Sequence, residues 1–195
     1  MSHLFIYLHG FRSSPQSSKA QITLEAINNL KSAEDVVWYA PQLPPSPKQA
    51  IQEIEKKISQ VAPIKLSIVG SSLGGYYATY LAEKYTDSVI TVLNPGVEPE
   101  KILCDHVGIN KNWHNDETFD FKSSYLTELE ELSVPDLSNP QRYLLLAATE
   151  DEVIDYKDMI SKYHACQIKL LEGEDHSITH YKQYVHLLIN HHFSS

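Results

Sequence analysis

The sequence predicts an α/β protein in which a doubly wound, mostly parallel, six-stranded sheet carries helices on both faces. Six short apolar runs alternate along the chain with longer segments of helical periodicity. Most of these runs are almost continuously apolar, as expected for strands that are buried on both faces. Strands and helices that alternate in this way form parallel sheets, because each helix carries the chain back across the sheet.

Each expected strand is a short run between polar or turn-forming residues. In chain order the six runs are HLFIYL (3–8), DVVWYA (35–40), IKLSIV (64–69), SVITVL (88–93), RYLLLAA (142–148) and CQIKLLE (166–172). The expected helices are 18–31, 47–61, 73–86, 155–164 and 178–193. In the first helix, apolar residues recur on roughly one face, and the proline-rich segment at 41–47 is interpreted as a rigid connection into the second helix.

Residues 95–139 interrupt this alternation between the fourth and fifth strands. This insertion contains NKNWHNDETFDF and a segment of helical character, SSYLTELEEL. Long insertions in compact domains are usually functional. We therefore expect one domain spanning residues 1–195, with residues 95–139 as a small lid or pocket wall.

The composition matches a globular protein of ordinary polarity. Hydrophobic residues make up 42% of the chain and charged residues 21%, and 195 residues suffice for one core. The formal net charge of −9 argues against a nucleic-acid partner, because such binding depends on cationic contacts with phosphates.

The sequence also bears on location. No apolar run is long enough to span a membrane, and the start of the chain lacks the basic region of a signal peptide. The two cysteines, Cys104 and Cys166, form neither a disulfide framework nor a metal-ligand cluster. We expect a cytoplasmic protein with no membrane partner and no metal.

The segment VGSSLGG contains the candidate nucleophile. A G-x-S-x-G turn needs glycines two residues before and after its serine, because the strand bends sharply into the helix. Gly70 and Gly74 flank Ser72 in this way, whereas Val69 and Leu73 flank Ser71. The pattern therefore favours Ser72 as the nucleophile.

A serine nucleophile needs a base and an acid from loops at the carboxyl edge of the sheet, in the chain order serine, acid, histidine. His176 follows the last expected strand and is the histidine in the required position. The acidic segment after the fifth strand offers Asp151, with Glu150 as its rival. Both remain candidates for the acid.

Two backbone N–H groups are expected to form the oxyanion hole. The N–H of Leu73 follows the nucleophile, at the start of a helix. The second donor is the N–H of Phe11, which follows the His-Gly pair at the end of the first strand. Because the first and third strands should be neighbours at the switch point of the sheet, Phe11 should lie beside Ser72.

With these residues assembled, the chain resembles the YqiA-like esterase family, small proteins of the α/β-hydrolase fold. The resemblance rests on YLHGF with SSP and SSKA, VGSSLGGYYATYLAEKY, LNPGVEP, RYLLLAATEDEVIDY and EGEDHS. It implies an esterase with Ser72 as nucleophile, His176 as base and Asp151 as acid. Glu150 stands where the family tends to have glycine, and the insertion is less similar than these motifs.

The expected activity is hydrolysis of carboxylic esters, with short acyl groups, through an acyl-enzyme intermediate. No metal or organic cofactor is expected, and the partner is a small-molecule ester. A thioesterase or acyltransferase with the same triad is an alternative, because the leaving group is selected by the pocket. A protein that keeps the fold only to bind a partner is another alternative.

Overall fold

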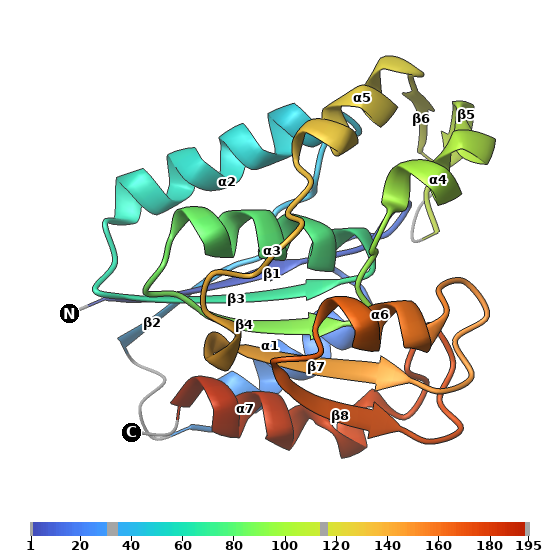
Figure 1. The fold of residues 1–195 in the computed structure, drawn as a ribbon. Helices are drawn as coiled ribbons and strands as arrows, with labels where there is room; N and C mark the ends of the chain where they lie inside the picture. The colour runs from blue at the N-terminus through green and yellow to red at the C-terminus, as the bar shows by residue number, and fades with distance from the viewer. Residues whose placement is uncertain (1, 31–34, 114–116, 194–195) are drawn as a thin grey trace.

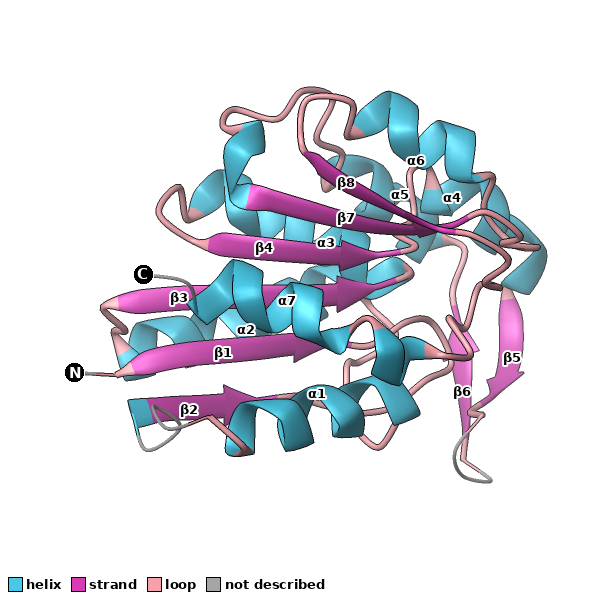
Figure 2. Cartoon of the chain, turned by 90° about the horizontal axis from the view of Figure 1, so that it is seen from below, coloured by secondary structure: helices cyan, strands magenta, loops and turns pink. Residues whose placement is uncertain are grey.

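The core of the protein is a six-stranded parallel sheet (Figures 1 and 2). The computed structural model describes residues 2–30, 35–113 and 117–193. In sheet order the strands are β2 (Val36–Tyr39), β1 (His3–Leu8), β3 (Lys65–Ser71), β4 (Val89–Leu93), β7 (Tyr143–Ala148) and β8 (Gln167–Leu171). All five pairings are parallel, so the predicted fold class is confirmed.

Helices cover both faces of this sheet. Helices α1 (Ser18–Asn28) and α7 (Val185–Phe193) pack on one face, in front of the strands in Figure 2. Helices α2 (Pro47–Val61), α3 (Leu73–Lys84) and α6 (Tyr156–Lys162) cover the opposite face. Strand β1 serves both layers: Leu4 and Ile6 belong to the core under α2 and α3, while Phe5 and Tyr7 belong to the core under α1 and α7.

The start of α2 shows how the sequence determines an element locally. Ser46 precedes the helix, and its hydroxyl accepts a hydrogen bond from the Gln49 N–H. Pro47 stands at the first helical position, where its missing N–H costs nothing. The side chains of Ala50, Ile51, Ile54 and Ile58 form one buried face. This face packs the helix onto the sheet.

The last predicted helix starts later than expected. Residues 178–193 show helical periodicity, but the structure has a short 3₁₀ turn, η4 (Tyr181–Gln183), before α7 begins at Val185. Ile178 adopts a left-handed conformation with φ of 49°. The buried carboxylate of Glu174 accepts hydrogen bonds from the His180 backbone N–H and the Tyr184 hydroxyl. The chain bends around this carboxylate, which a periodic pattern does not reveal.

The insertion forms a small layer beside the carboxyl ends of the central strands (Figure 1). It contains α4 (Pro99–Leu103), η2 (Cys104–His106), the antiparallel strands β5 (Gly108–Lys111) and β6 (Thr118–Phe121), and α5 (Ser124–Glu131); η3 (Pro140–Arg142) leads into β7. Helix α5 is the segment predicted to be helical. The hairpin was not predicted, because strands of four residues are too short for a clear alternation.

The structure gives two further facts about the helices and the cysteines. Within the parts of the chain that the structure describes, no helix is long and apolar enough to cross a membrane. Cys104 and Cys166 are both free thiols, with Cys104 exposed.

Candidate active site

Ser72 occupies the sharp turn between β3 and α3. Its backbone has φ of 55° and ψ of −121°, outside the regions that non-glycine residues normally adopt. Such a conformation costs on the order of 1–3 kcal/mol and persists only where the surroundings enforce it. Here the Ser72 N–H donates to the Leu93 carbonyl, and the Ser72 carbonyl accepts from the Gly96 N–H. The Ser72 hydroxyl makes no capping bond to α3.

The glycines of the motif are required by close backbone contacts. A Cβ atom on Gly70 would lie 2.1 Å from the Gly74 carbonyl oxygen, and one on Gly74 would lie 2.1 Å from that of Leu8. No side chain fits at either position. The turn therefore packs α3 directly against the end of β1.

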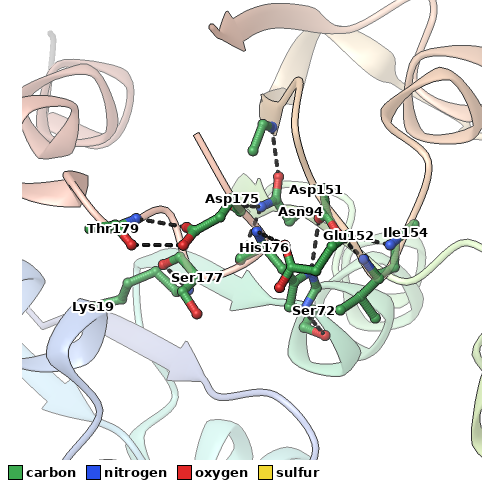
Figure 3. A network of polar contacts seen from close by, with 12 residues as sticks. Lys19, Ser72, Asn94, Asp151, Glu152, Ile154, Asp175, His176, Ser177 and Thr179 are labelled. Atoms are coloured by element: carbon green, nitrogen blue, oxygen red, sulfur yellow. Dashed lines mark hydrogen bonds and ion pairs between the residues drawn. The ribbon is translucent and has the colours of Figure 1, made fainter. Parts of the chain in front are cut away.

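His176 lies between Ser72 and Asp151 in one chain of hydrogen bonds (Figure 3). Its Nε2 is 3.1 Å from the Ser72 Oγ, and its Nδ1 is 2.7 Å from the Asp151 Oδ2. An ionised carboxylate only accepts hydrogen bonds, so Nδ1 carries the proton and Nε2 accepts from the serine hydroxyl. The Asp151 side chain is fully buried, whereas that of His176 is 19% exposed.

The carboxylates of the acidic segment after β7 make different contacts. The second Asp151 oxygen, Oδ1, accepts from the N–H groups of Val153 and Ile154, both at 2.8 Å. Glu150, the rival candidate, is exposed, and the carboxylate in contact with His176 belongs to Asp151. Glu152 accepts a hydrogen bond from the His176 backbone N–H at 3.0 Å.

Asn94 is a site residue that the sequence analysis missed. It follows β4, is 1% exposed and has φ of 43°. Its Oδ1 accepts from the Ala148 N–H at 2.8 Å, and its Nδ2 donates to the carbonyls of Asp175 and His176. Asn94 thus ties the loops that carry the acid and the histidine to one strand end. Its only sequence signal is its position directly after a strand.

Lys19 also binds the loop that carries His176, which Asn94 contacts through two carbonyls. Lys19 belongs to the first turn of α1, and its Nζ donates to the Ser177 carbonyl at 2.7 Å (Figure 3). Burial lowers the pKa of Lys19 to about 8, although the negative charges of Asp175 and Asp151 oppose this shift. Together with Asn94, Lys19 engages three successive backbone carbonyls around the histidine.

The loop after β1, which carries the expected oxyanion donor Phe11, lies beside Ser72. Strands β1 and β3 are neighbours, with Leu8 opposite Gly70, so the loop after β1 reaches Ser72. A Cβ on Gly10 would lie 3.1 Å from the Ser72 Cβ. Within the described residues, the N–H groups of Phe11 and Leu73 donate to no protein acceptor. Both donors are therefore available to a ligand.

Aromatic residues of the insertion pack around the side chain of Phe11. Its ring centroid lies 5.2 Å from that of Phe121, 5.5 Å from that of Phe119 and 5.5 Å from that of His106. The contacts with both phenylalanines are edge-to-face, a favourable arrangement of aromatic quadrupoles. The insertion therefore fixes the loop that carries the Phe11 N–H.

Arg12 reinforces this attachment. Its guanidinium lies 4.1 Å from the centroid of the Trp113 ring, and its Nε donates to the Lys111 carbonyl. The Trp113 N–H donates to the Arg12 carbonyl at 2.8 Å. Arg12 therefore ties the loop after β1 to the insertion.

His9 supports the loop after β1 from inside. It is 4% exposed, and its Nδ1 donates to the Gly10 carbonyl at 2.8 Å. Its Nε2 accepts from the Leu43 N–H in the proline-rich connection. Since both nitrogens are used in this way, the His9 ring is neutral and structural.

Two hollows flank the loop after β1. One, of about 270 Å³, lies on the Leu73 side, and its apolar wall includes Phe11, Leu43, Pro44, Leu73, Tyr77 and Phe119. The other, of about 470 Å³, opens beside the nucleophile and is lined in part by Tyr7, Lys19, Ser72, Trp113, His176 and Ser177. The described residues contain no group of three or more His, Cys, Asp or Glu side chains arranged to hold a metal ion.

The fold is that of the α/β hydrolases. Est1E from Butyrivibrio proteoclasticus, solved with ferulic acid, superposes with a TM-score of 0.76 at 14% identity, covering 99% of this chain and 90% of Est1E. A monoacylglycerol lipase from Paleococcus ferrophilus superposes with a TM-score of 0.68 at 16% identity, covering 96% of this chain and 94% of the lipase. Mouse alpha/beta hydrolase domain-containing protein 10 superposes with a TM-score of 0.67 at 14% identity, covering 96% of this chain and 89% of the mouse protein.

The sequence itself places the chain in a family. The model described as "Uncharacterised protein family (UPF0227)" matches residues 4–193. The chain belongs to this family, the YqiA-like family, and the resemblance seen in the sequence motifs is confirmed.

Proposed function

We propose that the protein is a serine esterase in which Ser72, His176 and Asp151 form the catalytic triad. The observation that carries this proposal is the continuous chain of hydrogen bonds from Asp151 through His176 to Ser72. It is supported by the strained turn at Ser72, whose hydroxyl makes no capping bond to α3 and hydrogen-bonds with His176 instead. The structural similarity to an esterase and a lipase agrees with this activity.

In the proposed mechanism, His176 Nε2 takes the proton of Ser72 as the hydroxyl attacks the ester carbonyl. The N–H groups of Phe11 and Leu73 hold the resulting oxyanion, and the buried Asp151 carboxylate stabilises the imidazolium. His176 then protonates the leaving alcohol. Water activated by the same histidine hydrolyses the acyl-enzyme.

The insertion acts, in this proposal, as a wall of the pocket. Phe119 and Thr118 line the smaller hollow, and Trp113 lines the larger one. The aromatic packing around Phe11 and the Arg12–Trp113 contact hold this wall against the oxyanion loop. The modest volumes of both hollows favour short acyl groups over long chains.

The first test is labelling with a fluorophosphonate probe, with the modified residue mapped by mass spectrometry. The probe reports an activated serine and an oxyanion hole and does not require the natural substrate. We expect label on Ser72 that disappears in Ser72→Ala and His176→Ala. The matched control is Ser67→Ala, since Ser67 lies on the strand that leads to Ser72, is fully buried and lines neither hollow, so it should leave the labelling intact. A folded protein that takes up no label contradicts the proposal.

Acyl preference is tested with p-nitrophenyl esters of two to twelve carbons and the matching thioesters. We expect kcat/KM to be highest for short oxygen esters. A maximum for long chains contradicts the short-acyl proposal, and a clear preference for thioesters points to the thioesterase alternative.

A further inference from the structure

We propose that the hollow beside Ser72 binds an anionic group of the substrate, a carboxylate or a phosphate, through the ammonium group of Lys19. This inference rests on the esterase function proposed above and names the class of its substrate. It concerns the wall opposite the insertion, where the first turn of α1 faces the nucleophile.

The charge of this hollow differs from that of the whole protein. The formal net charge is −9, yet Lys19 is the one lysine or arginine among the described residues that line the hollow, and no Asp or Glu lines it. His176 and Ser72 border the same space. A single cation in a hollow favours an anionic ligand even where the mean charge of the protein does not.

Lys19 also has no carboxylate partner in direct contact. In the described part of the chain, no carboxylate oxygen lies within ion-pair distance of its Nζ, whose one hydrogen bond goes to the backbone carbonyl of Ser177. An ammonium group has three donors, so two remain available. Charges removed from water are normally paired. An anionic ligand would supply the missing pair.

The nearest carboxylates are engaged elsewhere. Asp175 accepts hydrogen bonds from the backbone N–H and the hydroxyl of Thr179, and Asp151 accepts from His176. Asp175 and Asp151 attract Lys19 only at longer range. Their attraction does not cancel the effect of burial, so the pKa of Lys19 remains lowered to about 8. The Lys19 charge is thus only partly compensated in the unliganded protein.

Further donors line the hollow. Ser17 precedes α1 but makes no side-chain capping bond, so N–H groups of the first turn remain open at the positive end of the helix dipole. Tyr7 is 1% exposed, and its hydroxyl has no hydrogen-bond partner within the described residues. Tyr7, Ser17 and Ser71 line the same hollow. A ligand that accepts from Ser17 would let the Ser17 oxygen accept from Tyr7 in turn.

The test compares two esters that differ only in charge. Monoethyl succinate carries a carboxylate where ethyl succinamate carries a neutral amide of similar shape. We expect the native protein to hydrolyse monoethyl succinate with the higher kcat/KM. In Lys19→Met the ratio of the two kcat/KM values should fall on the order of 10- to 100-fold, the scale of a charge-assisted hydrogen bond. Lys19→Arg should retain much of the ratio.

The matched control is Lys56→Met, which removes the same charge from an exposed position on α2. It should leave the ratio unchanged. A second pair, the acetyl esters of glycerol phosphate and of glycerol, separates the two ligand chemistries. If only the glycerol pair shows a Lys19-dependent preference for the charged ester, the site binds a phosphate. If only the succinate pair shows it, the site binds a carboxylate.

Equal loss on charged and neutral esters in Lys19→Met would overturn the inference, because Lys19 would then act only by holding Ser177 and the histidine loop. Calorimetry on Ser72→Ala with monoethyl succinate separates this failure from a failure of the esterase proposal. Binding that weakens at least tenfold when Lys19→Met is added supports the anion site even in a protein that hydrolyses no ester. Binding insensitive to Lys19 overturns it.

Discussion

Histidines contact hydroxyl groups at the carboxyl edge of the central sheet and in two places away from it, with different results. At the carboxyl edge, His176 lies 3.1 Å from the Ser72 hydroxyl. Toward the amino end of β1, His3 lies 2.8 Å from the Ser67 hydroxyl, and beneath α7, His192 lies 2.9 Å from the hydroxyl of Thr91 in the middle of β4. Distance alone therefore does not distinguish a candidate catalytic pair from a structural one.

The surroundings make the distinction. Ser67, Thr91 and His192 are fully buried, so no substrate reaches them, whereas His176 is partly exposed beside a hollow. His176 contacts a carboxylate, while His192 and His3 contact none in the described residues. Burial, reinforced by nearby positive charges, lowers the pKa of His192 well below its usual value. A histidine there stays neutral and packs as an aromatic residue.

The largest expected effect comes from removing the hydroxyl group next to each histidine. Ser72→Ala should lower kcat on the order of 10⁶-fold, if the three side chains act as a unit. Ser67→Ala should leave kcat within about twofold, because Ser67 lies outside the reaction site even though its histidine distance is shorter. Ester hydrolysis at pH 7.5 measures both. Comparable losses in the two variants would contradict the proposed nucleophile.

The second prediction concerns the carboxylate that only the carboxyl edge possesses. Asp151→Asn should lower kcat on the order of 10⁴-fold, because an amide favours the wrong histidine tautomer. Glu150→Gln, at the exposed neighbouring position, should change kcat less than about threefold. The same assay decides which of the two carboxylates serves the histidine. A larger loss in Glu150→Gln would reverse the assignment.

A smaller effect is expected from the side chain that ties the histidine loop to β4. Asn94→Ala removes two donated hydrogen bonds and should lower kcat roughly 10- to 100-fold with little change in KM, because the base loses its alignment. The matched control is Asn110→Ala, which also removes two bonds to carbonyls but lies in the hairpin. A mainly structural role for Asn94 would give both variants a lower Tm and an unchanged kcat.

The smallest effect concerns stability at the amino edge. Burial, with a contribution from Lys65, lowers the pKa of His3 from about 6.5 to about 4 in the folded protein. The unfolded chain therefore binds the proton first, so stability is full above pH 6.5 and falls between pH 6.5 and 4, by roughly 1–3 kcal/mol.

Urea unfolding between pH 7 and 4 measures this loss. His3→Asn should flatten the slope in that window, whereas His186→Asn, at an exposed position, should retain it. An unchanged slope in His3→Asn would remove His3 from the acid response.

The sequence predicted the residues whose positions follow from general rules of the fold. Ser72 is marked by its flanking glycines, and His176 and Asp151 by their places after parallel strands. Lys19, Asn94 and Glu152 act on backbone groups of a loop, and the path of a loop depends on all its contacts. Strands β5 and β6 escaped prediction because strands of four residues show no clear alternation of apolar and polar residues.

The burial of the Phe11 ring among side chains of the insertion has a consequence for recombination between related chains. A donor segment 95–139 grafted alone would bring new neighbours to Phe11 and displace the N–H proposed to hold the oxyanion. The exchangeable module is therefore the insertion together with residues 9–13. Chimaeras that transfer both segments should inherit the donor's substrate range along with its rate.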